Sequence, residues 1–154
     1  MEPTGIVTQF KDLGAILVLG LAAIGSVLGA GVAGMSAIGA WKRNYAQNKS
    51  ASFMLVAFTA APLTQTVYGM IVMNKMLEIV TAKGLYLWSV GAFAGLAIGL
   101  SALFQGKCAA VACDAMGETG KGFANYIVVL GMTETVALFV MAFSMGLLGK
   151  LAGA

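Results

Sequence analysis

The stretch FANYIVVLGMTETVALFVMAFSMGLL, Phe123 to Leu148, decides the fold class of this 154-residue chain. It exceeds the ~20 apolar residues needed to cross a hydrocarbon layer, so we interpret it as a transmembrane helix. Its single charged side chain, Glu134, lies near the middle. An ionisable group at that depth costs at least ~2.5 kcal/mol, and such groups usually face protein and mark the path of an ion or a proton. The plainer alternative is a protonated Glu134 that only makes an interhelical hydrogen bond.

The composition of the whole chain is that of an integral membrane protein. Hydrophobic residues make up 60% and charged residues 10%, and the mean hydropathy is +0.92, far from the values of soluble domains. The net charge of +3 comes from few side chains between apolar stretches, which excludes the basic surface that a nucleic-acid partner needs. Residues 1–12 lack the basic start and cleavage site of a signal peptide, so we expect the first helix to be retained.

Three further apolar stretches predict three more transmembrane helices. The first contains a GxxxG pair, Gly25 and Gly29, and the third contains Gly91, Gly95 and Gly99 with the same spacing. Small residues in such rows let transmembrane backbones approach closely. We therefore expect an all-α membrane fold of four closely packed helices. The three stretches run from Leu13 to Ala40, from Ala51 to Met73 and from Leu85 to about Ala112.

The polar connections between these stretches, residues 41–50, 74–84 and 114–122, set the expected orientation. Positive residues prefer the cytoplasmic side, and residues 41–50 are the most basic connection. We therefore expect the 41–50 and 114–122 loops to be cytoplasmic. Both termini and the 74–84 connection would lie on the opposite side of the cell membrane.

The second and fourth stretches share a short repeat. Leu63-Thr64-Gln65-Thr66-Val67 aligns with Met132-Thr133-Glu134-Thr135-Val136. Each segment follows a glycine-rich stretch and a polar loop, so the chain resembles two copies of one helical hairpin, residues 13–73 and 85–148, within a single membrane domain. Tandem parallel hairpins can pack side by side with copies of themselves, and head-to-tail packing of this kind closes into a ring when the rotation permits. Only the second hairpin carries the carboxylate.

Polar side chains at the centre of the second stretch offer oxygen atoms to Glu134. Thr64 and Tyr68 are four residues apart and share a helix face, with Gln65 adjacent. Pro62 precedes them; it removes a backbone donor and is expected to bend the helix, which can free carbonyl oxygens. Carboxylate, amide, hydroxyl and carbonyl oxygens form a hard cage that suits a small cation. One negative charge suits one monovalent ion, so we favour sodium.

Gln105, in the third stretch, is a second candidate amide ligand. It lies near the end of its apolar stretch, two residues before Lys107, so it reaches Glu134 only if the third helix is long or shifted. A proton is the competing occupant, because a desolvated carboxyl group favours its neutral form and needs only a hydrogen-bond partner. A further hypothesis stays open, in which Gln65 and Gln105 only join helices by hydrogen bonds.

At these residues the sequence resembles the proteolipids, named c or K, that form the rotor ring of V-type rotary ATPases, especially the bacterial sodium-translocating members. The resemblance covers all four stretches and implies that Glu134 binds the transported ion. It is carried by Pro62, Thr64, Gln65 and Tyr68 in the second stretch, Gln105, Gly106 and Lys107 in the third, and Glu134 and Thr135 in the fourth. The other implied sodium ligands are Thr64, Gln65, Gln105 and the backbone carbonyl of Ala61, with Tyr68 in a supporting hydrogen bond. The family usually has a larger aliphatic residue at the position of Ala61, which a main-chain ligand tolerates.

The resemblance also implies an assembly. Identical copies would form a ring that turns in the lipid against a stator membrane subunit, and a stator arginine would loosen the ion on Glu134. Central-stalk subunits would contact the 41–50 and 114–122 loops. ATP would be hydrolysed by other subunits, so this chain would be no enzyme and would need no cofactor; it contains no nucleotide-binding motif.

Two other classes of function fit the sequence less well. A small transporter or channel that works without ATP commonly uses inverted repeats, whereas these hairpins are parallel because each has an even number of spans. A purely structural four-helix protein explains the glycine rows but not the polar cluster around Glu134.

Overall fold

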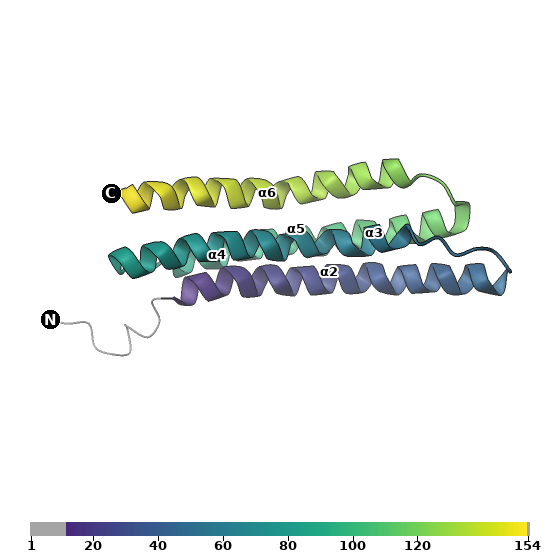
Figure 1. The fold of residues 1–154 in the computed structure, drawn as a ribbon, viewed down its shortest axis with the longest axis horizontal. Helices are drawn as coiled ribbons and strands as arrows, with labels where there is room; N and C mark the ends of the chain where they lie inside the picture. Colours follow the sequence, from purple (N-terminus) through teal and green to yellow (C-terminus); the bar gives the residue numbers. More distant parts are fainter. Residues whose placement is uncertain (1–11, 154) are drawn as a thin grey trace.

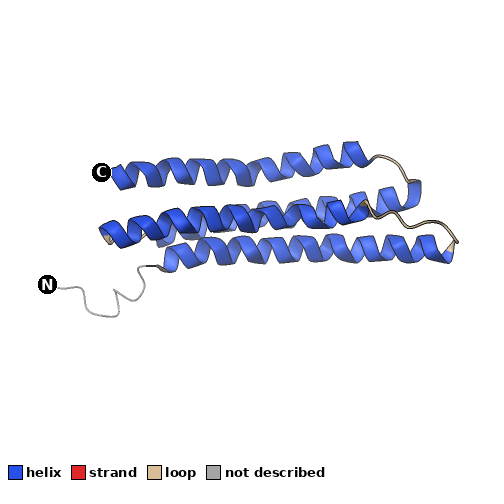
Figure 2. Cartoon of the chain, viewed as in Figure 1, coloured by secondary structure: helices blue, strands red, loops and turns tan. Residues whose placement is uncertain are grey.

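The computed structural model describes residues 12–153, and these include four long helical segments. The segments pack lengthwise into a bundle (Figure 1). Every regular element is helical and the described residues include no strand (Figure 2). The prediction of an all-α fold is therefore confirmed. The elements are α2 (Leu13–Ala46), α3 (Leu55–Ala60), the 3-10 turn η1 (Ala61–Leu63), α4 (Thr64–Lys83), α5 (Trp88–Thr119) and α6 (Phe123–Gly153).

Four segments are long and apolar enough to cross a membrane. They are α2, the continuous run from Leu55 to Lys83, α5 and α6. The first and third rods run in one direction and the second and fourth in the other (Figure 1). By length and composition these spans indicate a multi-pass membrane protein, as the sequence predicts.

The helices are longer than the apolar stretches that predict them, so the expected loop bounds are wrong. Residues 41–46 of the first loop belong to α2, residues 74–83 to α4, and residues 114–119 of the third loop to α5. Charged residues end an apolar stretch, but they do not end a helix that continues beyond the hydrocarbon layer. Gly84 and Gly120 end α4 and α5 in the left-handed conformation, with φ of 65° and 68°.

The core of the bundle is the parallel contact between α2 and α5. Gly25 lies against the backbone of Gly99, and Gly29 lies against Gly106, so closely that a Cβ atom at these positions would overlap the opposite backbone. Because lipid provides no hydrophobic drive, close packing of small residues is what holds such helices together. The glycine rows of the first and third stretches therefore face each other within one chain.

Pro62 shapes the segment that leads into the candidate site. It lies inside the 3-10 turn η1, which separates α3 from α4 and ends directly before Thr64. Proline cannot donate a backbone hydrogen bond, and a 3-10 turn inside a helix marks such a distortion. Pro62 itself is buried. The expected bend thus takes the form of a short tightened turn at the level of the polar cluster.

Candidate ion-binding site

Glu134 lies in the first half of α6 and accepts hydrogen bonds from two other helices. Its Oε1 accepts from the Thr64 hydroxyl at 2.7 Å and from the Tyr68 hydroxyl at 2.6 Å, both on α4. Its Oε2 accepts from Gln105 Nε2 on α5 at 3.2 Å. Hydrogen bonds to a charged acceptor are roughly twice as strong as neutral ones, so this arrangement suits an ionised carboxylate.

Two glutamine side chains close the inner side of the site. Gln65 Nε2 donates to Gln105 Oε1 at 2.7 Å, and both side chains are completely buried. Gln105 Nε2 also donates to the Leu130 carbonyl at 2.9 Å. Buried amides need such partners because an unpaired polar group in a low-dielectric interior costs about 1–3 kcal/mol. The pair fixes the amide oxygen of Gln65 toward Thr64, whose hydroxyl is 3.1 Å away.

The Thr64 hydroxyl lies among more acceptors than it can serve. Its Oγ1 is 2.7 Å from Glu134 Oε1, 3.0 Å from the Ala61 carbonyl and 3.1 Å from Gln65 Oε1. A hydroxyl has one hydrogen and donates to one acceptor at a time. The Ala61 carbonyl and Gln65 Oε1 therefore compete for the Thr64 proton with Glu134 Oε1, which also accepts from Tyr68.

The site is closed on one side and open on the other. Gln65 and Gln105 are buried, whereas Glu134 is half-buried and Thr64 is exposed on the surface of the chain. The carboxylate is therefore reachable from the surface beside Thr64, while the amides behind it form a fixed wall.

The residues that the sequence analysis named as sodium ligands lie together in the structure, with Tyr68 beside them. The condition placed on Gln105 is met because α5 continues to Thr119, which puts Gln105 near the middle of a 32-residue helix. Whether the cluster binds an ion stays a prediction. The members of the cluster are Ala61, Thr64, Gln65, Tyr68, Gln105 and Glu134.

Sequence analysis missed two contributors to the site. The Leu130 carbonyl accepts from Gln105, and Ser101 donates to the Thr133 carbonyl at 2.6 Å, which ties α5 to α6 one turn from the site. Ser101 lies four residues before Gln105, so its place on the same helix face was a signal present in the sequence. A backbone acceptor such as Leu130 leaves no signal in the residue type.

The donor set consists of oxygen atoms of the kind that bind hard cations. Within residues 12–153 no group of three or more His, Cys, Asp or Glu side chains lies together. Cys113 is buried, and Cys108 is partly buried. One carboxylate with amide, hydroxyl and carbonyl oxygens matches a small monovalent ion better than a thiophilic metal.

Comparison with known proteins finds similarity to ATP synthase proteolipids. Residues 88–147, the segment that includes Glu134, match the family model of the C subunit of ATP synthase. The chain is also 34% identical over 128 residues to the A-type ATP synthase subunit K of Methanocaldococcus jannaschii. That similarity covers 82% of this chain and 56% of the relative, so the chain spans little more than half of the relative's length. On these two matches the chain is similar to the c and K proteolipids of ATP synthases.

Proposed function

We propose that this chain is the ion-carrying subunit of a membrane rotor ring in a rotary ATPase or ATP synthase. The observation that carries the proposal is the carboxylate of Glu134, which lies mid-span and is held by Thr64, Tyr68 and Gln105. Similarity to the c and K proteolipids supports this interpretation of the carboxylate. The chain itself hydrolyses no ATP; that reaction belongs to other subunits.

We infer that the carried ion is sodium. Glu134 Oε1, Gln65 Oε1 and the Ala61 carbonyl all lie within 3.1 Å of Thr64 Oγ1, which has one hydrogen to offer. A cation among these oxygens would relieve the surplus of acceptors and balance the charge of Glu134. The electroneutral pair could then move through lipid, where a bare carboxylate is costly.

A proton is the second candidate, and one observation favours it. The hydroxyls of Tyr68 and Thr64 lie 2.6 Å and 2.7 Å from Glu134 Oε1, so a protonated Glu134 would have an acceptor at hand. A proton carrier does not require the amide oxygen of Gln65 or the Ala61 carbonyl. The presence of these two oxygen atoms beside Glu134 therefore favours sodium over a proton.

The open side of the site supports exchange against a stator. Thr64 is exposed and Glu134 half-buried, so a cationic side chain of a neighbouring membrane protein could approach the carboxylate and weaken its hold on the ion. We propose that this group is a stator arginine. The ion would leave as Glu134 passes the stator and would be replaced before Glu134 returns to lipid.

We further propose that the chain arose by duplication of one hairpin. The first copy comprises α2 to α4 and the second α5 and α6, and the repeat places Gln65 where the second copy has Glu134. Gln65 has no charge with which to hold an ion of its own, and its amide contributes to the site around Glu134. Each chain therefore carries one ion on four spans.

The orientation follows from the basic residues. Lys42, Arg43 and Lys49 lie at or beyond the end of α2, at the end of the bundle where α5 turns into α6 (Figure 1). By the positive-inside rule this end faces the cytoplasm. Central-stalk subunits would contact the connections of residues 47–54 and 120–122 there, and the opposite end of the bundle would carry both termini.

Carbodiimide labelling of Glu134 tests the proposal, because the reagent attacks the protonated acid. In the purified oligomer, sodium should slow labelling across pH, and potassium at equal ionic strength should slow it much less. If sodium has no effect and labelling only declines as the pH rises, the ring carries protons. If Glu134 is not labelled above the level of Glu78, which lies in an exposed ion pair with Lys75, the site assignment is wrong.

A further inference from the structure

One fully buried side-chain oxygen in the described part of the chain has no hydrogen-bond partner. It is the hydroxyl oxygen of Ser26 on α2, a residue that is only 2% exposed. A buried polar group without a partner costs free energy, and native proteins contain few of them. Ser26 follows Gly25, which packs on Gly99 of α5, and one step along a helix turns the side chain by about 100°. The partner of Ser26 must therefore be sought outside the α2–α5 contact.

Two close contacts fix the register of α2 against the second span. A Cβ atom added at Gly29 would lie 3.0 Å from Pro62 Cβ, and one added at Gly69 would lie 2.7 Å from Ala22 Cβ. The two spans run in opposite directions (Figure 1). Seven residues separate the two contacts on each span, so the antiparallel register is the same at both.

This register sets Ser26 opposite Gln65. Ser26 lies four residues after Ala22 on α2, and Gln65 lies four residues before Gly69 on α4. Residues four apart share a helix face, so both side chains lie on the faces that meet. Gln65 is completely buried, as Ser26 nearly is. The unpartnered hydroxyl is therefore at the level of the glutamine that contributes to the ion site.

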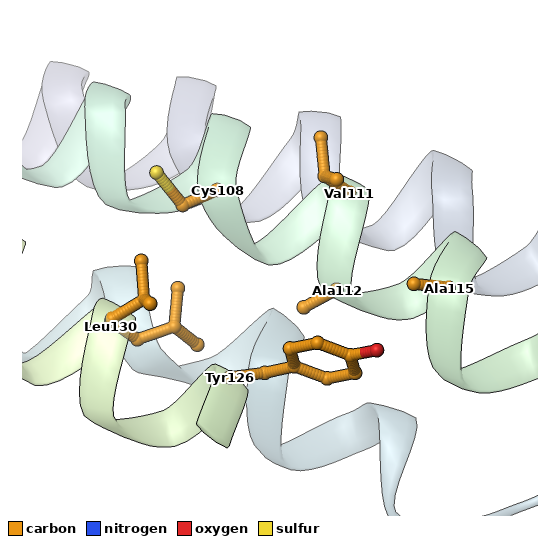
Figure 3. Close-up of a pocket in the computed structure, with 7 residues that line it drawn as sticks. Cys108, Val111, Ala112, Ala115, Tyr126 and Leu130 are labelled. Carbon is orange, nitrogen blue, oxygen red and sulfur yellow. The ribbon is translucent and has the colours of Figure 1, made fainter. Parts of the chain in front are cut away.

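The Gln65 amide has a second hydrogen to donate. Its Nε2 carries two hydrogens, and among residues 12–153 it donates one of them, to Gln105 Oε1 at 2.7 Å. Figure 3 shows a cavity of about 300 Å³ beside Leu130, the other partner of Gln105, with Cys108 across from it. The residues that line this cavity come from α5 and α6 and include none from α4. The second N–H of Gln65 therefore does not open into it, and α2 is the side from which an acceptor can come.

We propose that Ser26 is a positioning residue of the sodium site and that its hydroxyl accepts the second N–H of Gln65. The structure shows no direct hydrogen bond between the two, so the link requires a rotation of the Ser26 side chain or one bridging water. With both N–H groups held away from the site, Gln65 Oε1 stays directed toward Thr64 and the ion. Without Ser26 the buried N–H would turn toward the oxygen atoms of the site and compete with sodium for them. The inference deepens the sodium site of the proposed function, on which it rests.

Sodium protection of Glu134 in the purified oligomer of Ser26→Ala tests this role. The sodium concentration that halves carbodiimide labelling should rise about fivefold, which is the worth of one neutral hydrogen bond. Ser36→Ala is the matched control, because this hydroxyl on the same helix donates to the Ala110 carbonyl at 2.6 Å, about three turns from Ser26. It should leave the half-protection value unchanged. In a Gln65→Leu background, which has no amide to position, Ser26→Ala should cause no further loss.

Labelling without sodium separates positioning from a general loss of structure. The pH at which labelling falls to half should be the same in Ser26→Ala as in the wild type, because a protonated Glu134 does not use Gln65 Oε1. A shift of that pH, an unchanged sodium half-protection value, or an equal further loss in the Gln65→Leu background would overturn the inference. If sodium does not protect the wild-type protein, the proposed sodium site fails and this inference fails with it. Intact protection of the wild type therefore identifies a failure of the inference alone.

Discussion

Replacing Thr64 by valine would test the sodium site at its most crowded oxygen atom, the Thr64 hydroxyl. The substitution keeps the shape of the side chain and removes the one hydroxyl that lies within 3.1 Å of Glu134 Oε1, Gln65 Oε1 and the Ala61 carbonyl. A hydrogen bond to a charged group contributes about 1.5–3 kcal/mol, and the exposure of Thr64 places it at the lower end. About 1.5 kcal/mol corresponds to roughly a tenfold loss of sodium affinity.

The assay is the sodium concentration that halves carbodiimide labelling of Glu134 at fixed pH. In Thr64→Val it should rise about tenfold, in proportion to the lost affinity. Two controls should stay near the wild-type value: Thr64→Ser keeps the hydroxyl, and Thr59→Val removes a hydroxyl that donates only to the Val56 carbonyl. An unchanged half-protection value in Thr64→Val would refute the role of this oxygen in the site.

Three further outcomes are expected. Tyr68→Phe removes the 2.6 Å hydrogen bond to Glu134 and should weaken sodium protection by a similar factor. Tyr126→Phe, at a ring that packs on Phe58, should leave sodium protection unchanged. Equal effects of the two substitutions would count against a specific role for Tyr68. Gln65→Leu leaves the buried Gln105 Oε1 without its donor and should lower the stability of the protein by about 1–3 kcal/mol, measured by thermal unfolding. It should also weaken sodium binding, measured as the sodium concentration that halves labelling. An unchanged unfolding temperature would contradict the buried amide pair. Gly106→Ala places a methyl group against the backbone of Gly29 and should reduce the yield of folded protein, whereas Gly146→Ala on α6 meets open space; equal yields would show that α2 and α5 are not packed as described.

The polar cluster could be predicted from the sequence because the membrane leaves few alternatives. Glu134, Gln65 and Gln105 lie in apolar surroundings where an unpaired polar group is costly, so each had to meet the others. Their residue types alone indicated a shared site, and the structure joins them by hydrogen bonds. Fold class followed from the same physics, since only helices and closed barrels satisfy their backbones in lipid.

Helix ends and backbone partners could not be predicted in the same way. Apolar length measures the hydrocarbon layer, whereas α5 extends to Thr119 past the charged residue Asp114, whose carboxylate pairs with Arg43 at 3.0 Å. This is why the sequence suggested a place near a helix end for Gln105, although it is near the middle. The Leu130 carbonyl became a partner of Gln105 only through the relative rotation of α5 and α6, which residue types do not encode.

Direct counting of bound sodium tests the central role of Glu134 most simply. The purified oligomer is equilibrated with radioactive sodium, and the ion retained per chain is compared between the wild-type protein and Glu134→Gln, which keeps the size of the side chain and removes its charge. One sodium per chain in the wild type and none in Glu134→Gln is the predicted result. Equal retention by both proteins, or no retention by the wild type at saturating sodium, would contradict a sodium site on Glu134.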